Sequence, residues 1–287
     1  MAKIGPRAVL LLSCPDRRGI VAEVSHFIFS YGGNIVQADQ HNDPETNTFF
    51  MRVDFDIAEF EIPHEDISDA FKPIGTKFSM NYAVHYTNVA HRLALFCSKQ
   101  THCLHDLLLR HREGEVGGEI VAVVSNHDEA RDIAGYFDVP FHHIPMAKAS
   151  EGEAEERQLA LLREIEVDLI VLARYMRILS PEFVEAYPDK IINIHHSFLP
   201  AFVGARPYHQ AFSRGVKIIG ATSHYVTADL DQGPIIEQDV TRVSHRDSVD
   251  DLVAKGKNLE KLVLARAVKL HLEHRVLVFR NKTVVFE

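Results

Sequence analysis

The order of apolar and polar residues divides the chain into two regions with different periodicities. Over residues 7–86, short apolar or alternating runs lie beside two segments whose apolar residues recur at helical spacing. Two alternating runs on either side of the turn cluster 43–47 indicate a hairpin. The predicted elements are a strand at 8–14, a helix at 20–31, strands at 34–40 and 48–55, a helix at 65–71 and a strand at 77–86. This βαββαβ order predicts a ferredoxin-like domain.

From residue 91 onward, buried apolar strands alternate with longer helices. Such alternation is typical of a mostly parallel, Rossmann-like sheet with helices on both faces. The predicted strands are 93–97, 120–125, 169–173, 190–194, 217–226 and 234–240, the helices are 101–113, 128–137, 152–165 and 248–270, and a hairpin joins 276–279 to 283–286. Asp128 and Ser180 are predicted N-caps. We therefore predict two domains of α/β class, 7–86 and 91–287, with a linker at 87–90.

Composition and charge narrow the class of partner. The 287 residues are 46% hydrophobic and 25% charged, which is ordinary for a soluble globular protein. A net charge of -9 disfavours a nucleic-acid or anionic-membrane surface. No apolar run approaches the roughly 18 residues that span a bilayer, and the first residues lack a signal-peptide pattern. We expect a cytoplasmic protein that acts on or binds a small molecule, with no nucleic-acid or membrane partner.

Cysteine and histidine usage gives no sign of a redox or metal centre. Cys14, Cys97 and Cys103 form no CxxC pair, so we predict buried thiols. There are 18 histidines, but the HExxH signature is absent, and the sequence 271–274 has the wrong spacing for it. We expect no metal site.

The first candidate for chemistry lies where an apolar strand meets a polar loop. Asn193 and His195 are two residues apart in an extended segment, so their side chains project to the same side. Ligands of open α/β sheets bind at such strand ends, where one donor and one titratable base would converge. The alternative is that both side chains cap a loop. The acidic turn 229–234, taken alone, is typical of a solvated loop.

Three motifs in order resemble the folate-dependent formyltransferases, over residues 91–287. They are the block 171–180, Asn193-Ile194-His195 with Ser197 and Leu199-Pro200, and Asp231 before Gly233-Pro234-Ile235-Ile236. The resemblance implies that Asn193 donates to an oxyanion and that His195 transfers protons. It also implies that Asp231 tunes His195 and orients the nucleophile.

The same resemblance implies a folate pocket. It assigns substrate binding to Tyr175, Met176, Arg177, Ile178, Leu179, His196, Ser197, Thr227 and Gly233. Backbone groups of 175–179 would pair with the polar edge of the pterin, and apolar side chains would cover its face. The alternative is that Met176, Ile178 and Leu179 are core residues. Because folate is the substrate, we expect no tightly bound cofactor.

The N-terminal domain resembles an ACT domain. The resemblance rests on 15–22, Pro-Asp-Arg-Arg-Gly-Ile-Val-Ala, and 32–35, Gly-Gly-Asn-Ile. It implies an amino-acid effector and self-association into a homo-oligomer. The expected effector residues are Asp16, Gly19, Gly32, Gly33 and Asn34. Simple helix termination is the alternative explanation of the two adjacent glycines.

An ACT-like domain before a formyltransferase-like domain resembles the formyltetrahydrofolate deformylases. The resemblance implies hydrolysis of 10-formyltetrahydrofolate to formate and tetrahydrofolate, which supplies formate to one-carbon and purine metabolism. The alternative activity is formyl transfer to an amine. Two departures from the transferase pattern favour water over an amine as the acceptor of the formyl group: His196, where the transferases carry proline, and the glycine-free loop 97–100. His196 either narrows the acceptor channel or packs the loop. A folate sensor without catalysis would not need Asn193, His195 and Asp231.

Overall fold

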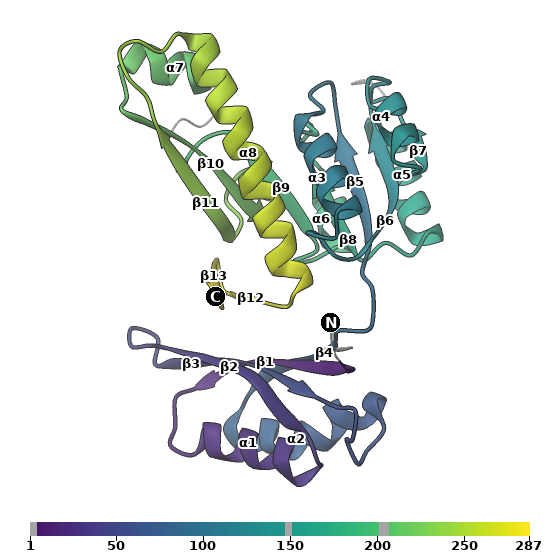
Figure 1. The fold of residues 1–287 in the computed structure, drawn as a ribbon, viewed down its shortest axis with the longest axis vertical. Coiled ribbons are helices and arrows are strands. Elements are labelled where there is room, and N and C mark those ends of the chain that lie inside the picture. Colours follow the sequence, from purple (N-terminus) through teal and green to yellow (C-terminus); the bar gives the residue numbers. More distant parts are fainter. Residues whose placement is uncertain (1–4, 147–150, 201–206) are drawn as a thin grey trace. The chain divides into compact units, whose positions relative to one another are not determined.

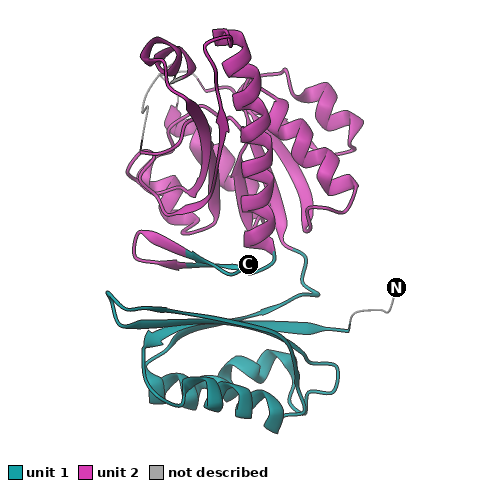
Figure 2. Cartoon of the chain, turned by 60° about the vertical axis from the view of Figure 1, so that its left-hand side comes forward, with its two compact units in different colours: residues 1–90, 273–277, 284–287 teal, residues 91–272, 278–283 magenta. Residues whose placement is uncertain are grey.

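The chain forms two compact units in the computed structural model, which describes residues 5–146, 151–200 and 207–287. Unit 1 comprises Met1–Ala90, Glu273–Leu277 and Val284–Glu287, and unit 2 comprises His91–Leu272 and Val278–Thr283 (Figure 2). The predicted second domain, 91–287, therefore differs from the observed division at the chain's end. There, residues of a short C-terminal hairpin are shared between the units. No described helix is long and apolar enough to cross a membrane.

Unit 1 is a four-stranded antiparallel sheet with two helices on one face (Figure 1). Its elements are β1 (Arg7–Pro15), α1 (Ile20–Ser30), β2 (Asn34–Asp43), β3 (Thr48–Asp56), the 3-10 turn η1 (His64–Asp66), α2 (Ile67–Phe78) and β4 (Asn81–Tyr86). The strand order is β2-β3-β1-β4. The apolar faces of β1, α1 and α2 meet in a core that includes Leu10, Val24 and Phe71.

The boundary between α2 and β4 differs from the prediction. Helix α2 continues past residue 71 to the buried Phe78, because Phe71, Gly75 and Phe78 extend its buried face. Ser79 then ends the helix in a left-handed conformation, with a φ of 55°. The predicted strand 77–86 consequently begins only at Asn81.

Unit 2 is built on a seven-stranded sheet in the order β11-β10-β9-β8-β5-β6-β7. The strands are β5 (Arg92–Cys97), β6 (Glu119–Ser125), β7 (Phe141–His143), β8 (Leu169–Leu172), β9 (Ile191–His195), β10 (Ile218–Tyr225) and β11 (Ile235–Arg242). The five strands from β9 to β7 are parallel, and β10 runs antiparallel to both β9 and β11. The mostly parallel α/β sheet is thus confirmed, with an antiparallel edge that was not predicted.

Helices pack against this sheet and position the site. They are α3 (His102–Arg112), α4 (Arg131–Tyr136), α5 (Glu151–Glu164), α6 (Pro181–Ala186), α7 (Pro207–Arg214) and α8 (Val249–Leu272). Helix α8 lies against β9, β10 and β11 (Figure 1). The core of the parallel half includes Phe96, Val124 and Leu172. The chain ends in a hairpin of β12 (Val276–Phe279) and β13 (Lys282–Val285).

One of the two predicted helix caps is confirmed and the other is wrong. The Ser180 hydroxyl accepts a hydrogen bond from the backbone N–H of Phe183, as an N-cap does. The N-cap of α4 is instead Ala130, and the Asp128 carboxylate binds the guanidinium of Arg131 at 2.7 Å. A strong charged partner nearby therefore outcompetes the backbone for this carboxylate. All three cysteines are buried free thiols, as predicted.

Candidate active site

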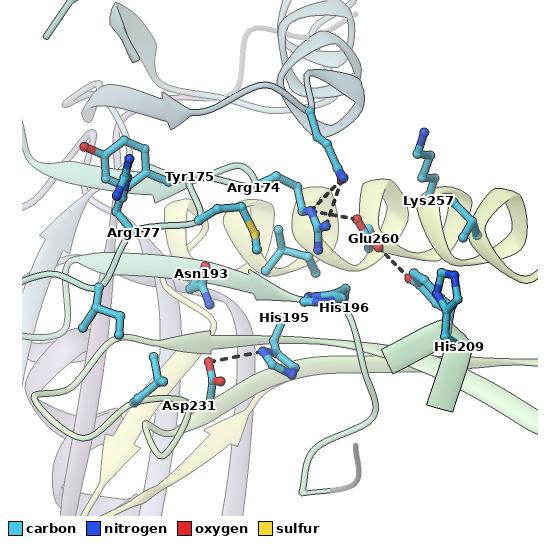
Figure 3. A pocket seen from close by; sticks show the side chains of 17 residues that line it. Arg174, Tyr175, Arg177, Asn193, His195, His196, His209, Asp231, Lys257 and Glu260 are labelled. Carbon is cyan, nitrogen blue, oxygen red and sulfur yellow. Dashed lines mark hydrogen bonds and ion pairs between the residues drawn. The ribbon is translucent and has the colours of Figure 1, made fainter. Parts of the chain in front are cut away.

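Strand β9 delivers the two predicted polar side chains to one cavity. Asn193 and His195 share a face of the strand, and both line a cavity of about 570 Å³ in unit 2 (Figure 3). The remaining walls come from Gln100 after β5, from the segment after β8, from the loop after β10 and from helices α7 and α8. The loop-capping alternative fails for this pair, because the two side chains face a cavity of ligand size.

Asp231 completes the predicted trio by reaching His195 from the loop between β10 and β11. Its Oδ1 atom lies 3.2 Å from Nδ1 of His195 (Figure 3). The neighbouring His195, and after it His224, hold the pKa of Asp231 well below its usual range, so it is ionised at neutral pH. Asp231 adopts a left-handed φ of 56°, which aspartate tolerates better than most residues. The acidic turn is therefore part of the site and is not a solvated loop.

The bond to Asp231 determines how the His195 ring is used. A carboxylate accepts the Nδ1–H, so the neutral ring carries its lone pair on Nε2. That Nε2 atom is buried and has no hydrogen-bond partner among the described residues. The His195 side chain is only 8% exposed. A buried basic nitrogen left open beside a cavity is suited to accepting a proton from a bound reactant.

His224 was not predicted and belongs to the same constellation. Strand pairing sets it opposite Asn193, and its Nε2 atom lies 3.2 Å from the Asn193 Nδ2 atom. Its Nδ1 atom lies 2.8 Å from the Tyr225 carbonyl, which can only accept, so Nδ1 carries the proton. In the neutral ring Nε2 then accepts one N–H of Asn193. The second N–H of that amide remains available to a ligand.

The block 175–179 contributes to the cavity in three different ways. Met176 and Ile178 line it and are 61% and 70% exposed, so they are not core residues. Leu179 is buried, as its core alternative states, but also lines a smaller adjoining pocket together with Thr227. Arg177 lines both pockets and donates to the Met146 carbonyl at 3.2 Å.

Tyr175 is also among the residues that line the cavity, but its side chain is packed in the core, so its ring is not offered to a ligand. It is 1% exposed, and its hydroxyl accepts from Gln158 Nε2 at 2.8 Å and lies 2.9 Å from the Met146 sulfur. Burial raises the pKa of this hydroxyl to about 12. Its backbone carbonyl accepts a hydrogen bond from Ser98. Tyr175 therefore anchors the segment instead of offering its ring to a ligand.

Of the remaining predicted binding residues, His196 lines the cavity, whereas Ser197 and Gly233 support the surrounding backbone. His196 lines the cavity, and burial, followed by Arg174 and His195, lowers its pKa to about 4, so its ring is neutral at neutral pH. Ser197 is buried outside the residues that line either pocket, and its carbonyl accepts from Thr222 at 2.9 Å. Gly233 is also scaffold: a Cβ there would lie 1.8 Å from the Tyr225 carbonyl oxygen.

A polar wall of the cavity was also missed. Glu260 of α8 is 1% exposed. Its Oε2 atom lies 2.7 Å from His102 Nε2 and 3.5 Å from Arg174 Nε, and its Oε1 atom accepts a hydrogen bond from the Tyr208 hydroxyl at 2.6 Å. Burial alone would raise the pKa of Glu260, but His102, Arg174 and Tyr208 together lower it. The sequence signal that could have revealed Glu260 is an acidic residue at an apolar position of a long helix.

The Glu260 surroundings also contain a geometrically possible metal trio. Ligand atoms of His102, Cys103 and Glu260 lie within 4.8 Å of one another. Burial holds the pKa of the Cys103 thiol well above its usual value, so it stays protonated. Arg174 already supplies a positive charge to the Glu260 carboxylate. These donors fit an ion-pair network better than a cation site.

In unit 1, the predicted effector residues lie at the ends of α1. Gly19 is its N-cap, with a φ of 95°, and Gly32 and Gly33 follow its C-terminus. A Cβ at Gly33 would lie 2.8 Å from side-chain atoms of Ile28 and Phe60, so close packing accounts for this glycine. The other two residues are Asp16, whose carboxylate accepts from Asn42 Nδ2 at 2.5 Å, and the exposed Asn34. Effector binding stays a prediction.

Comparisons with known proteins agree on one family. Residues 91–268 match the family described as formyl transferase. The formyltetrahydrofolate deformylase of Synechocystis sp. is 52% identical over 97% of this chain and 98% of its own length. A crystal structure of a formyltetrahydrofolate deformylase from Pseudomonas syringae superimposes with a TM-score of 0.97, at 46% identity, covering 100% of this chain and 96% of that one. A crystal structure of a glycinamide ribonucleotide transformylase from Symbiobacterium toebii superimposes with a TM-score of 0.67, at 30% identity, covering 71% of this chain and 97% of that one.

Proposed function

The chain belongs to the formyltetrahydrofolate deformylases of the formyl transferase family, and we propose that it hydrolyses 10-formyltetrahydrofolate through Asn193, His195 and Asp231. The products are formate and tetrahydrofolate, so the enzyme is a hydrolase of a carbon–nitrogen bond. The observation that carries the mechanism is the open, buried Nε2 atom of His195, whose ring is oriented by Asp231. The reaction as written needs no resident cofactor or metal.

His195 acts as the proton carrier. Its Nε2 atom takes a proton from water as the water oxygen bonds to the formyl carbon. The tetrahedral intermediate then collapses: the bond from the formyl carbon to the folate nitrogen breaks, and that nitrogen receives the proton from His195. One water thus supplies the hydroxyl of the formic acid and the hydrogen of the released amine, and the acid ionises to formate.

Asn193 stabilises the oxyanion of the intermediate. One N–H of its amide is held by His224. In this proposal the other N–H donates to the formyl oxygen. Such a donor gains strength as negative charge develops, and losing one typically costs about 10² to 10³ in rate. His224 acts through Asn193, so it is a positioning residue.

Asp231 has two functions in this scheme. It fixes the proton on Nδ1 of His195, and it stabilises the imidazolium that forms when Nε2 takes the proton. In this proposal its second oxygen orients the attacking water. The folate would lie along Met176, Arg177, Ile178, Leu179 and Thr227, with the formyl carbon between Asn193 and His195.

A direct assay separates hydrolysis from formyl transfer. Purified protein is incubated with 10-formyltetrahydrofolate labelled with ¹³C in the formyl group, with and without primary amines. We expect formate and tetrahydrofolate in equal amounts, unaffected by the amines. A formylated amine as the main product would establish the transferase alternative. The expected role is the supply of formate to one-carbon and purine metabolism in the cytoplasm.

Unit 1 is proposed to be an ACT-like regulatory domain that binds an amino acid and joins subunits into a homo-oligomer. The antiparallel β2-β3-β1-β4 sheet and the glycines around α1 support this assignment. Calorimetric titration with a panel of amino acids, repeated with Asp16→Ala, tests the effector, and light scattering tests the oligomer. No binding heat and no change in turnover with any amino acid would remove the regulatory assignment.

A further inference from the structure

One wall of the cavity has no part in the chemistry described above. Four polar side chains form it, namely Gln100, Arg174, Tyr208 and Glu260, and His102 contacts Glu260 from outside the lining; we call these five residues the Glu260 cluster. Arg174 and Glu260 lie on one side of His195 and His196, and Asp231 lies on the other (Figure 3). The cluster therefore borders the cavity on the side opposite to the carboxylate that activates His195.

Arg174 is a buried member of the cluster with an unusual backbone conformation. Arg174 follows β8 with a left-handed φ of 66°, a conformation that is strained for a residue with a Cβ and not for glycine. Its side chain is only 6% exposed, and Nε and Nη2 both donate to Gln100 Oε1, at 3.1 and 2.9 Å. Its Nη1 atom is buried without a partner among the described residues.

Tyr208 is fitted to the same wall by a glycine. A Cβ at Gly256 of α8 would lie 2.0 Å from the Tyr208 hydroxyl, so the ring can lie across the helix only because position 256 lacks a side chain. The hydroxyl then donates to Glu260, whose other oxygen binds His102. Both carboxylate oxygens are thus occupied within the cluster.

We propose that the Glu260 cluster determines the nucleophile, by filling the acceptor side of the cleft so that only water reaches the formyl carbon. This inference rests on the proposed function. A nucleophile must approach His195 Nε2 to lose its proton, and an amine also carries a substituent that needs space behind it. Arg174 and Tyr208 line the cavity, and in this proposal they take up the space that the substituent would need. The Glu260 carboxylate, satisfied by three neighbours, offers no open site to an amine.

Opening the cluster should convert part of the hydrolysis into transfer. In that reaction the amine nitrogen bonds to the formyl carbon, the bond from that carbon to the folate nitrogen breaks, and the amine's proton passes through His195 to the folate nitrogen. This transfer needs no oxidant and no reactant besides the folate and the amine. Arg174→Gly removes the side chain and also suits the left-handed backbone. Gln100→Ala changes an exposed residue and removes the oxygen that accepts hydrogen bonds from the Arg174 guanidinium.

The test measures how the label divides between two products. Each protein receives ¹³C-formyl-labelled folate with glycinamide as the amine, and NMR gives the ratio of N-formylglycinamide to formate. Arg280→Gly is the matched control, because Arg280 also has a left-handed φ, 57°, but is exposed and lies outside the residues lining the cavity. We expect Arg174→Gly to raise the ratio at least about tenfold, since steric exclusion from a pocket commonly discriminates by that much. Gln100→Ala should move it in the same direction, and Arg280→Gly should leave it unchanged.

The outcomes separate this inference from the proposed function. A wild-type protein that releases no formate contradicts the function itself. Normal release with an unchanged product ratio in Arg174→Gly and Gln100→Ala overturns the cluster's role alone. Slower hydrolysis without formyl transfer also overturns it, because a purely structural wall would have that effect. If Arg174→Gly has no thermal transition, the exposed Gln100→Ala variant decides.

Discussion

The sharpest prediction concerns the carboxylate of Asp231. Asp231→Asn keeps the shape of the side chain and an oxygen that accepts from His195 Nδ1, but it removes the charge. When His195 takes a proton, an imidazolium forms 3.2 Å from this carboxylate. With an effective dielectric constant near 20, Coulomb's law gives about 5 kcal/mol for such a pair. The neutral hydrogen bond already supplies part of this energy before the reaction begins.

If about half of that attraction arises only as charge develops, roughly 2 to 3 kcal/mol is lost from transition-state stabilisation. This corresponds to a loss of about a hundredfold in turnover. His195→Ala should lose at least as much, because it removes the proton carrier. Formate release in single turnovers measures both variants. Asp138→Asn is the control, since Asp138 also has a left-handed φ, 57°, but is exposed and outside the residues lining the cavity.

Circular dichroism should show that both variants retain the fold, because His195 and Asp231 lie at a cavity and not in the core. Turnover equal to that of the wild type, in either folded variant, would refute the assignment of proton transfer to this pair.

Three further predictions follow from the surroundings of the trio. Asn193→Ala should lose about 10² to 10³ in turnover, and His224→Phe should lose less with little change in KM; equal losses, or a change in KM alone, would contradict a positioning role for His224. Gly233→Ala should lower the free energy of unfolding by at least about 2 kcal/mol, because its Cβ would overlap the Tyr225 carbonyl; an unchanged thermal midpoint would contradict this. Because the folded-state pKa of Asp231 is depressed, its ionisation stabilises the protein above pH values of about 4, and this contribution is lost as the pH falls. The stability difference between the wild type and Asp231→Asn in urea should therefore shrink below about pH 4; a difference that grows there would show the opposite sign of coupling.

Secondary structure was largely accessible from periodicity, since each strand or helix must bury its own apolar face. The errors have two sources, a competing partner for a local signal and segments too short to show a period. Asp128 has the residue type of an N-cap, but Arg131 binds its carboxylate. Strand β7 and helix α7 were missed, because segments of three and eight residues carry too few positions for a period to emerge.

The candidate site shows the same division between local and distant information. Asn193 and His195 are adjacent through strand geometry, so their convergence followed from spacing alone. Tyr175 belonged to a block assigned to the ligand, but its ring points into the core. Contact between His224 and Asn193 depends on the pairing of β9 with β10, which the spacing of their residues does not specify.

The sequence by itself determined the α/β class, the strand-end position of Asn193 and His195, and the motifs that identify the family. Only the tertiary structure decided that Asp231 binds His195, that His224 holds Asn193, and that Glu260 joins Arg174, His102 and Tyr208. Periodicity reflects which face of an element is buried and is therefore a local property. The distances between side chains from separate elements depend on strand order, on helix packing and on positions such as Gly233 and Gly256, where only a missing Cβ permits the contact.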